Sequence, residues 1–386
     1  MRRLTFVGLA VALCLTVGLA IGFTAARPAS PAAELTSGKV NIQSAGALAF
    51  GPNGILFVGD SVGGNVAAID TGDSKAMKAG SINVQGLDTK IAGLVGIPAD
   101  QVVINDVKVN PVSHNVYISG ARGKGPDAAP LVVKVDASGN VSNISLDNAK
   151  NQVVSLVDAP ASNPTARGGN PRMLTITDMN YVNGSLMVAG LSNEEWNSSL
   201  RAIPYPFKSA DKGATLQIWH ASHGRYETQA PIRTFVPYTI QGTQYVLAAY
   251  TCTPLVKIPV SDLKPGAQVK GTTIADLGSG NQPLDMIPYK KDGHDFILVA
   301  NSSRGVMKLR ADNLESYEKI DSPTVPNPPS NIAGVPYDTL QDLKGVQHIA
   351  RLDDNNALLL MGGWTGQPWA PGAPQGPINL QTIALP

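Results

Sequence analysis

A strand–turn–strand unit that recurs six times constrains the fold of this chain more than any other feature. In the clearest copy, ALAF (residues 47–50) leads through the turn GPNG (51–54) into the apolar strand ILFVG (55–59). Asn-Gly after Pro favours a tight reverse turn, because both residues accept a positive φ. Further strands are expected at residues 65–70 and 79–84. Related copies begin at residues 106, 178, 235, 285 and 348, which is a spacing of about 50 to 70 residues.

One such unit cannot cover both faces of its own sheet, so the units have to stack around a common axis. The repeat therefore predicts an all-β chain folded as a six-bladed β-propeller of four-stranded blades. The last copy has only one clear later strand, at residues 378–385. We expect residues 39–43 (KVNIQ) to supply the outer strand of that last blade, which would close the ring and cover a sheet edge.

The composition excludes several other classes of protein. The 386 residues include 39 Gly and 29 Pro, only 15% are charged, and the formal net charge is +1. Coiled coils and helical arrays need many charged helix formers and few Gly or Pro. Binding of nucleic acid through phosphate contacts needs a basic excess that this chain lacks. The 43% of apolar residues are enough to build a large core.

The inserts between the units carry their own patterns. Helical spacing of apolar residues predicts a short helix over residues 88–95. A second helix is expected over residues 337–343, with Asp338 as its cap. Residues 192–212 and 362–377 are expected to be long loops that leave the second strands of their blades.

The N-terminus reads as an export signal followed by a linker. Residues 1–26 contain Arg2 and Arg3, an apolar run and a small-residue end typical of a signal peptide, although an uncleaved anchor remains an alternative. Residues 27–38 are a Pro/Ala-containing linker, and residues 39–386 form the propeller. The protein is therefore expected to be periplasmic or extracellular, and in contact with a membrane only if the signal stays attached. We expect a monomer.

Cysteine usage leaves the exported part without a disulfide. Cys14 lies inside the signal, and Leu13 before it is not the small residue that lipidation requires. Cys252 then remains alone, so no intramolecular disulfide can form and stability has to come from the core.

Charged and polar residues gather where the innermost strands begin and the second strands end. These two places meet at one mouth of a propeller channel. The first strands contribute Asp106, Asp178, Asp285 and His348. The second strands end at or near Asp60, Arg122, Asn193, Cys252, Asn301, Arg304 and Trp364. In a chain with so few charges, this grouping predicts a ligand site at the axial mouth.

Three carboxylates near one axis repel one another, so a bound proton or a cation has to reduce this repulsion. Oxygen ligands from the three aspartates, together with Asn105 or Asn301, would suit Ca²⁺. Arg122 and Arg304 could instead pair with the carboxylates or hold an anionic ligand. A structural network of hydrogen bonds is the third interpretation.

Three further residues carry weaker signals. Cys252 could be a metal ligand or a nucleophile, although a buried, inert cysteine is the commoner case. His220 and His223 resemble a metal-binding pair, but no thiol or second pair lies near them in sequence. His348 has the position for general acid–base work, with a hydrogen-bonded structural role as the alternative.

The stretch ALAFGPNGILFVGDSVGGNVAAID (residues 47–70) resembles blades of the NHL and gluconolactonase-like six-bladed propellers. The resemblance is to a blade pattern, and it is strongest in this first unit. It implies Ca²⁺-dependent lactonases and esterases whose metal sits at the channel mouth on carboxylate and Asn side chains. By position, Asp106, Asp178 and Asp285 would be those ligands here. QSAG (43–46) stands where the family has an acidic ligand.

Three functions follow as hypotheses. The first is an exported propeller that binds a small ligand, a metal or a protein partner at its axial face. The second is a Ca²⁺-dependent hydrolase of the lactonase or esterase type, with His348 as acid–base residue. The third is an accessory protein of a periplasmic redox system, in which Cys252 and His348 would share a metal.

Overall fold

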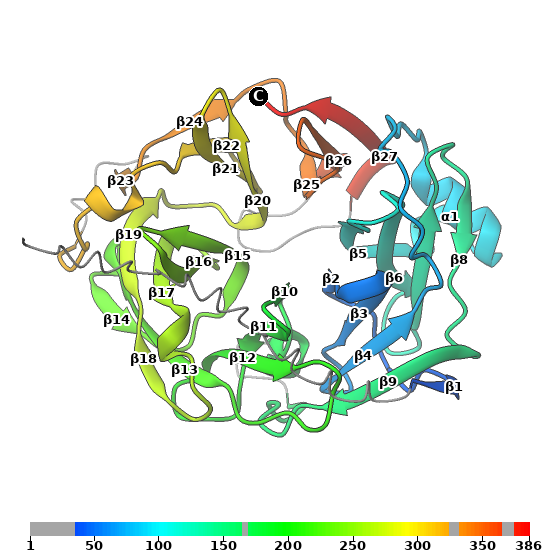
Figure 1. The fold of residues 1–386 in the computed structure, drawn as a ribbon, viewed down its shortest axis with the longest axis horizontal. Coiled ribbons are helices and arrows are strands. Elements are labelled where there is room, and N and C mark those ends of the chain that lie inside the picture. Colours follow the sequence, from blue (N-terminus) through cyan, green and yellow to red (C-terminus); the bar gives the residue numbers. More distant parts are fainter. Residues whose placement is uncertain (1–34, 164–168, 324–331, 365–373) are drawn as a thin grey trace, which may run out of the picture. The chain divides into compact units, whose positions relative to one another are not determined.

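The computed structural model describes residues 35–163, 169–323, 332–364 and 374–386. Six mainly antiparallel sheets surround a central axis, each with its innermost strand toward the centre (Figure 1). The prediction of an all-β, six-bladed propeller is confirmed, although the blades contain three to five strands on their main path rather than four throughout. The predicted signal at residues 1–26 lies outside the described residues.

We number the blades by the chain order of their innermost strands. The first blade contains, from the inside outward, β2 (Leu48–Phe50), β3 (Ile55–Asp60), β4 (Asn65–Asp70), β9 (Ala149–Ser155) and β1 (Thr36–Gly38). The second contains β5 (Val102–Val109), β6 (Val116–Arg122), β7 (Ala129–Val135) and β8 (Val141–Asn143). The third contains β10 (Asp178–Val182), β11 (Ser185–Leu191), β12 (Ser198–Pro204), β13 (Ala214–His220) and β14 (Arg225–Glu227), with β18 (Gln268–Lys270) beside β13.

The other three blades follow in the second half of the chain. The fourth contains β15 (Ile232–Ile240), β16 (Thr243–Tyr250), β17 (Pro254–Pro259), β19 (Thr272–Leu277) and β23 (Ile332–Gly334). The fifth contains β20 (Pro283–Lys291), β21 (His294–Asn301), β22 (Gly305–Arg310) and β24 (Tyr337–Leu340). The sixth contains β25 (Val346–Arg351), β26 (Asn356–Trp364) and β27 (Pro374–Ala384).

The helices are short and connect the blades. The α-helix is α1 (Leu87–Val95), which confirms the helix predicted over residues 88–95. The 3₁₀ turns are η1 (Pro52–Gly54), η2 (Ala99–Gln101), η3 (Pro171–Leu174), η4 (Ala221–His223), η5 (Val260–Asp262) and η6 (Leu314–Ser316). Within the described residues, no helix has the length and apolar character needed to span a membrane.

The blades do not follow one another around the ring in chain order. The second blade is inserted between β4 and β9 of the first, because the chain completes β5 to β8 before it returns to add β9. Innermost strand β2 therefore has β5 on one side and β10 on the other, and β25 lies beside β5. The resulting order around the axis is second, first, third, fourth, fifth, sixth (Figure 1).

The apolar cores lie between neighbouring blades and reflect this order. Phe57 of the first blade packs with Met179 and Leu186 of the third. Val107 of the second blade shares a cluster with Leu360 of the sixth. Each blade thus buries its faces against the blades beside it, as the repeat pattern required.

The predicted closure of the last blade by residues 39–43 is wrong. The backbone N–H of Val40 donates to Leu146 O (2.7 Å), and β1 pairs with β9 in the first blade. The edge of the last blade is met instead by Val84, which forms an isolated bridge with Leu380 of β27. The order of the blades explains this outcome, because β9 takes the place beside β4 that residues 79–84 were expected to fill. That segment is then free to reach the sixth blade.

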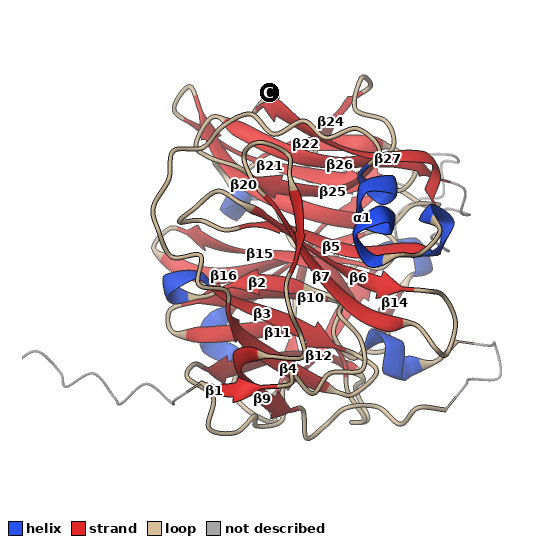
Figure 2. Cartoon of the chain, turned by 90° about the vertical axis from the view of Figure 1, so that its right-hand side faces the viewer, coloured by secondary structure: helices blue, strands red, loops and turns tan. Residues whose placement is uncertain are grey.

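Helix α1 reinforces the same junction, and Figure 2 shows it on the outside of the strands. Leu87 and Ile91 are buried in the cluster that joins the second and sixth blades. Asp88 accepts a hydrogen bond from the N–H of Ile378 (3.2 Å). The α-helix and Val84 together close the ring.

Two other expectations about the inserts are wrong. Residues 337–343 were expected to be helical, but Tyr337–Leu340 forms the edge strand β24, paired with β22. Residues 192–212 were expected to be a loop, but Ser198–Pro204 forms β12. Arg201 hid the apolar pattern of that strand: it is fully buried, and its Nε lies 2.7 Å from Asp158 Oδ1. Of the loop predicted at residues 362–377, residues 365–373 lie outside the described residues.

Candidate functional site at the propeller axis

Three aspartates stand on alternate blades around the axis. Asp106, Asp178 and Asp285 come from the second, third and fifth blades, and all three are buried. Each accepts a hydrogen bond from the N–H of the next residue in its own strand. Each also faces an N–H of the next blade around the ring, at distances of 2.7 Å (Leu48), 2.9 Å (Phe235) and 3.4 Å (Ile349). The aspartates thus fasten the six innermost strands together in three pairs.

Lys108 supplies the counter-charge for all three carboxylates. It lies two residues after Asp106 on β5, so its side chain points to the same face of the strand. Its Nζ lies 3.7 Å from Asp106, 3.9 Å from Asp178 and 3.5 Å from Asp285. Burial alone would lower the pKa of Lys108, but the three carboxylates raise it above its ordinary value. The ammonium group therefore stays charged among the carboxylates.

The three carboxyl groups differ in their affinity for a proton. Burial raises the pKa of Asp178 to about 6, against the opposing attraction of Lys108. Burial likewise raises the pKa of Asp106. The pKa of Asp285 is lowered, because Lys108, His348 and the N–H of Met286 outweigh the effect of burial. Asp178 is therefore a group at the axis that can take up a proton just below neutral pH, and the pKa of Asp106 is shifted in the same direction.

His348 completes the ring from the sixth blade. Its Nδ1 lies 3.5 Å from an oxygen of Asp106 and 3.5 Å from an oxygen of Asp285. These distances are at the outer limit for a hydrogen bond, so the nitrogen remains without a close partner. We define the axial cluster as Asp106, Lys108, Asp178, Asp285 and His348.

A cavity of about 820 Å³ opens above the axial cluster. Its polar lining includes Ser44, Ser61, Asn105, Lys124, Thr177, Arg233, Thr234 and Gln347, together with the five residues of the axial cluster. A second cavity of about 470 Å³ also contacts Lys108 and Asp178. The axial cluster therefore forms the constriction between two cavities.

Bulges in the innermost strands place several residues in the larger cavity. The strand register shifts in β5, β20 and β25 just before Asp106, Asp285 and His348, and in β15 just before Thr234. The inserted residues are Asn105, Arg233, Leu284 and Gln347, and all four line the cavity. A bulge turns a side chain away from the regular alternation of a strand, which is why bulges often occur beside functional sites.

Arg233 and Gln347 bring hydrogen-bond donors that the protein leaves unused. The Nε of Arg233 and the Nε2 of Gln347 are buried and have no hydrogen-bond partner among the described residues. Among the described residues Arg233 has no carboxylate within ion-pair distance. Burial lowers its pKa, against the opposing attraction of Asp178, Asp285 and Asp106 at longer range. An unsatisfied buried donor costs about 1–3 kcal/mol, so a ligand that offers acceptors would relieve this cost.

The structure brings together one part of the predicted site and not the other. The first-strand set, which is Asp106, Asp178, Asp285 and His348, meets at the axis with Asn105 beside it. Those members of the second-strand set whose side chains the structure describes do not line the axial cavity. Asp60 is fully buried and accepts hydrogen bonds from Ser44 and Gly63, and Arg122 is exposed at the end of β6.

The remaining predicted residues lie elsewhere. Asn301 and Arg304 line a separate cavity of about 450 Å³ between the fifth and sixth blades. Cys252 lies beside His220 and His223 rather than near His348. Cys252 and His348 therefore cannot bind the same metal ion, as the redox hypothesis required. Burial raises the pKa of Cys252 to about 11, with Asp276 and Glu227 adding to it, so its free thiol keeps its proton. The side chain of Trp364 lies outside the described residues.

The residues that the sequence analysis missed are Lys108, Arg233 and Gln347. Lys108 had a usable signal, because residues two apart on a strand share a face and Asp106 was already assigned to the axis. Arg233 and Gln347 had none, since nothing in their sequence marks a bulge.

The axial cluster fits a calcium ion poorly. Ca²⁺ needs six to eight oxygen ligands, whereas the oxygens of the three aspartates already accept backbone N–H groups. The Nζ of Lys108 also lies among the same carboxylates, at distances between 3.5 and 3.9 Å. A cation carried by the chain itself thus stands where the metal was expected, and we derive no chemistry from bound calcium.

No family model matches the chain, and no curated protein matches it. Solved structures with a similar fold include the PQQ-bound aldose sugar dehydrogenase of Streptomyces coelicolor, with 10% identity, a TM-score of 0.35, and coverage of 91% of this chain and 97% of that one. Streptogramin B lyase has 8% identity and a TM-score of 0.37 over the same shares. A thermostable family-43 glycoside hydrolase has 10% identity and a TM-score of 0.38 over 73% of this chain and 89% of its own. Likeness at this level carries no argument about activity, so the function has to be argued from this chain's own residues.

Proposed function

We propose that the protein binds a small hydroxylated carboxylate, such as a sugar acid, in the axial cavity. The observation that carries this proposal is a pair of donors in the lining that no described residue accepts from: Arg233 Nε and Gln347 Nε2. Both are nitrogen atoms. The cavity therefore calls for a ligand rich in oxygen acceptors.

The charges around the cavity further restrict the class of ligand. Lys108 is balanced by the three aspartates, whereas Arg233 has no carboxylate of the protein within ion-pair distance among the described residues. A guanidinium group binds a carboxylate through two parallel hydrogen bonds. The ligand's carboxylate would pair with Arg233, and its hydroxyl groups would meet Gln347, Asn105 and the carboxyl groups below.

Binding of gluconate tests this proposal, with glucose as the neutral probe of similar size. We expect calorimetry to detect gluconate but not glucose, and Arg233→Met to weaken gluconate binding by about tenfold or more, the loss of one charge-assisted contact. Arg122→Met is the matched control, because Arg122 is exposed and does not line the cavity. Equal binding of both probes, or unchanged affinity in the Arg233 variant, would refute the proposal.

A second candidate is a hydrolase of the lactonase or esterase type, in which the hydroxylated carboxylate would be the product. It is supported by Asp178, whose pKa of about 6 suits proton transfer near neutral pH, and by the position of His348 between two carboxylates. Hydrolysis of gluconolactone, with and without a chelator and Ca²⁺, separates this function from binding alone. Loss of hydrolysis in His348→Gln, with gluconate binding retained, would support the hydrolase. Hydrolysis that requires added Ca²⁺ would support the hypothesis of a Ca²⁺-dependent hydrolase.

A further inference from the structure

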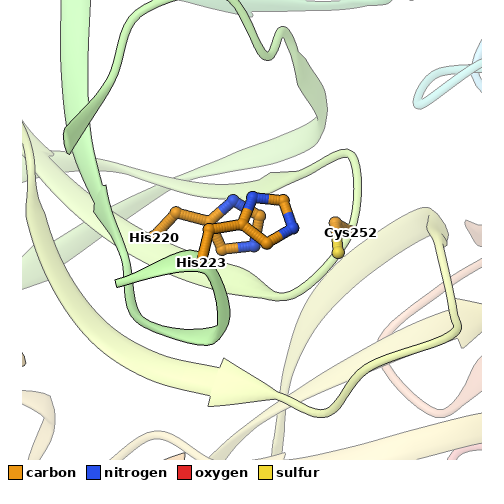
Figure 3. Close-up of side chains that lie close together, drawn as sticks. All are labelled: His220, His223 and Cys252. Carbon is orange, nitrogen blue, oxygen red and sulfur yellow. The ribbon is translucent and has the colours of Figure 1, made fainter. Parts of the chain in front are cut away.

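A second cluster of metal-binding side chains lies away from the axis, at the junction of the third and fourth blades. His220 ends β13 and His223 ends the turn η4, whereas Cys252 stands in the turn between β16 and β17. Figure 3 shows the two imidazole rings overlapping, with Cys252 beside them. One ring nitrogen of each histidine and the Cys252 sulfur all lie within 4.8 Å of one another.

Glu227 on β14 holds both rings in a defined orientation. Its two carboxylate oxygens accept from Nδ1 of His220 (2.7 Å) and Nδ1 of His223 (2.7 Å). A carboxylate that binds one nitrogen of an imidazole leaves the other nitrogen as the lone-pair donor, and this is the usual support for a histidine that binds a metal. Nε2 is therefore the coordinating atom that each ring has left.

The Nε2 of His220 has no partner of its own. His220 is only 1% exposed, and its buried Nε2 forms no hydrogen bond with any residue that the structure describes. A buried polar nitrogen in a described region with no acceptor or donor opposite it calls for an explanation. A ligand bound between His220, His223 and Cys252 provides one.

The two parts of the cluster are held together by further contacts. Ser222, between the histidines, donates to Asp276 of β19 (2.7 Å) and lies 3.4 Å from the hydroxyl of Thr253, next to Cys252. The histidine turn of the third blade is thus fixed to the cysteine loop of the fourth. Asp276 and Glu227 also make the surroundings favourable for a cation.

We propose that His220, His223 and Cys252 bind a zinc ion that links the third and fourth blades. Imidazole and thiolate are the ligands that Zn²⁺ prefers, and three of them with an open fourth position match a site that also holds water or a solvent-borne ligand. His223 leaves the site open to solvent, because 46% of its side chain is exposed. When the ion binds, the thiol proton of Cys252 passes to solvent and the sulfur coordinates as the thiolate.

The experiment uses the purified full chain, loaded with ZnCl₂, dialysed and analysed for metal content. We expect one zinc per chain, and Co²⁺ in place of zinc to give a sulfur-to-cobalt charge-transfer band. Cys252→Ser should lose that band, and His223→Ala should lower zinc affinity by about tenfold or more, the loss of a ligand at a site of this kind. His294→Ala is the matched control, because His294 is also an exposed histidine hydrogen-bonded to a carboxylate.

Cys252→Gly is a control for the possibility that Cys252→Ser loses the band through misfolding. The φ of Cys252 is 100°, in the region that favours glycine, so this variant is expected to fold at least as well while it loses the band. Absence of bound zinc in the parent protein, or a charge-transfer band that survives in both Cys252 variants, would overturn the proposal. Because the site lies apart from the axial cavity, gluconate binding and zinc binding can fail independently.

Discussion

The axial cluster and the His220–His223–Cys252 cluster both gather groups that bind cations, but only at the axis does a cation of the chain lie directly among those groups. Lys108 lies within 3.9 Å of three carboxylates at the axis. At the other cluster Arg225 Nε lies 2.9 Å from Glu227, behind the histidines, and the Nε2 of His220 faces no partner. The number of acidic residues alone would favour a metal at the axis. The axial carboxylates, however, already have partners, whereas the Nε2 of His220 has none among the described residues, and this favours a metal at the blade junction.

The two clusters also connect neighbouring blades in different ways. At the axis, charges on alternate blades fasten the innermost strands and form the constriction between the cavities. At the rim, a turn of one blade meets a loop of the next, and the bridging group comes from outside. The following variants test this distinction, in order of expected effect.

Lys108→Met should have the largest effect, because it removes the cation and leaves three buried carboxylates facing one another. We expect a loss of about 3–5 kcal/mol in the free energy of unfolding, typical of breaking a buried ion pair. Urea denaturation measures it. Ca²⁺ should then restore part of the stability in this variant and not in the parent, since the carboxylates would be open to a metal. Lys124→Met, at an exposed residue of the cavity, is the control. Equal losses of stability in both variants would contradict the role of Lys108 as the counter-charge of the three carboxylates.

Asp178→Asn and Asp285→Asn should change stability in opposite directions at neutral pH. The pKa of Asp178 is raised from 3.8 to about 6, so its ionisation costs stability above about pH 6 and costs nothing below about pH 4. The pKa of Asp285 is lowered, so its contribution is present above its unfolded value and lost as the pH falls.

At pH 7 we expect Asp178→Asn to stabilise the fold by roughly 1–3 kcal/mol. This gain should disappear as the pH falls from 6 to 4. Asp285→Asn should destabilise the fold at pH 7. Thermal unfolding over this pH range measures both effects, and the same sign for both variants at pH 7 would contradict the assignment.

Glu227→Gln should weaken zinc binding while the three ligands stay in place. Removal of a carboxylate that orients metal ligands typically lowers affinity by about 10- to 100-fold. Competition with a chromophoric chelator measures the change. The cobalt charge-transfer band should persist, because the sulfur still coordinates, and its loss would mean that Glu227 holds the fold of the turn.

Ser222→Ala should have the smallest effect, because it removes a single hydrogen bond between the two halves of the site. We expect about 1 kcal/mol or less in stability and a zinc affinity a few-fold lower. The same measurements apply. A loss as large as that of a ligand variant would show that the geometry depends on Ser222 rather than on the ligands.

The blade pattern was readable in the sequence because turn residues such as Asn53-Gly54 interrupt apolar strands at regular intervals. The order of the blades was not readable. Strand β9 has no feature that assigns it to the first blade rather than the second, and pairing over such a separation is decided by tertiary contacts. The error about residues 39–43 followed from that one step.

At the site, position along the innermost strands was enough to assign Asp106, Asp178, Asp285 and His348 to the axis. The ends of the second strands led to a wrong assignment for Asp60. Its carboxylate accepts hydrogen bonds from backbone N–H groups of nearby loop residues. The zinc site depends on Cys252, which is 29 residues from His223 and on another blade. Sequence proximity could not supply it, although the HASH motif marked half of it.

An anomalous difference map from crystals soaked in ZnCl₂, recorded above the zinc absorption edge, would locate the metal directly. We expect a single strong peak per chain, between His220 Nε2, His223 Nε2 and Cys252 Sγ. We expect no peak among the carboxylates of Asp106, Asp178 and Asp285, where Lys108 Nζ lies. A peak at the axis with none at the blade junction would contradict this expectation.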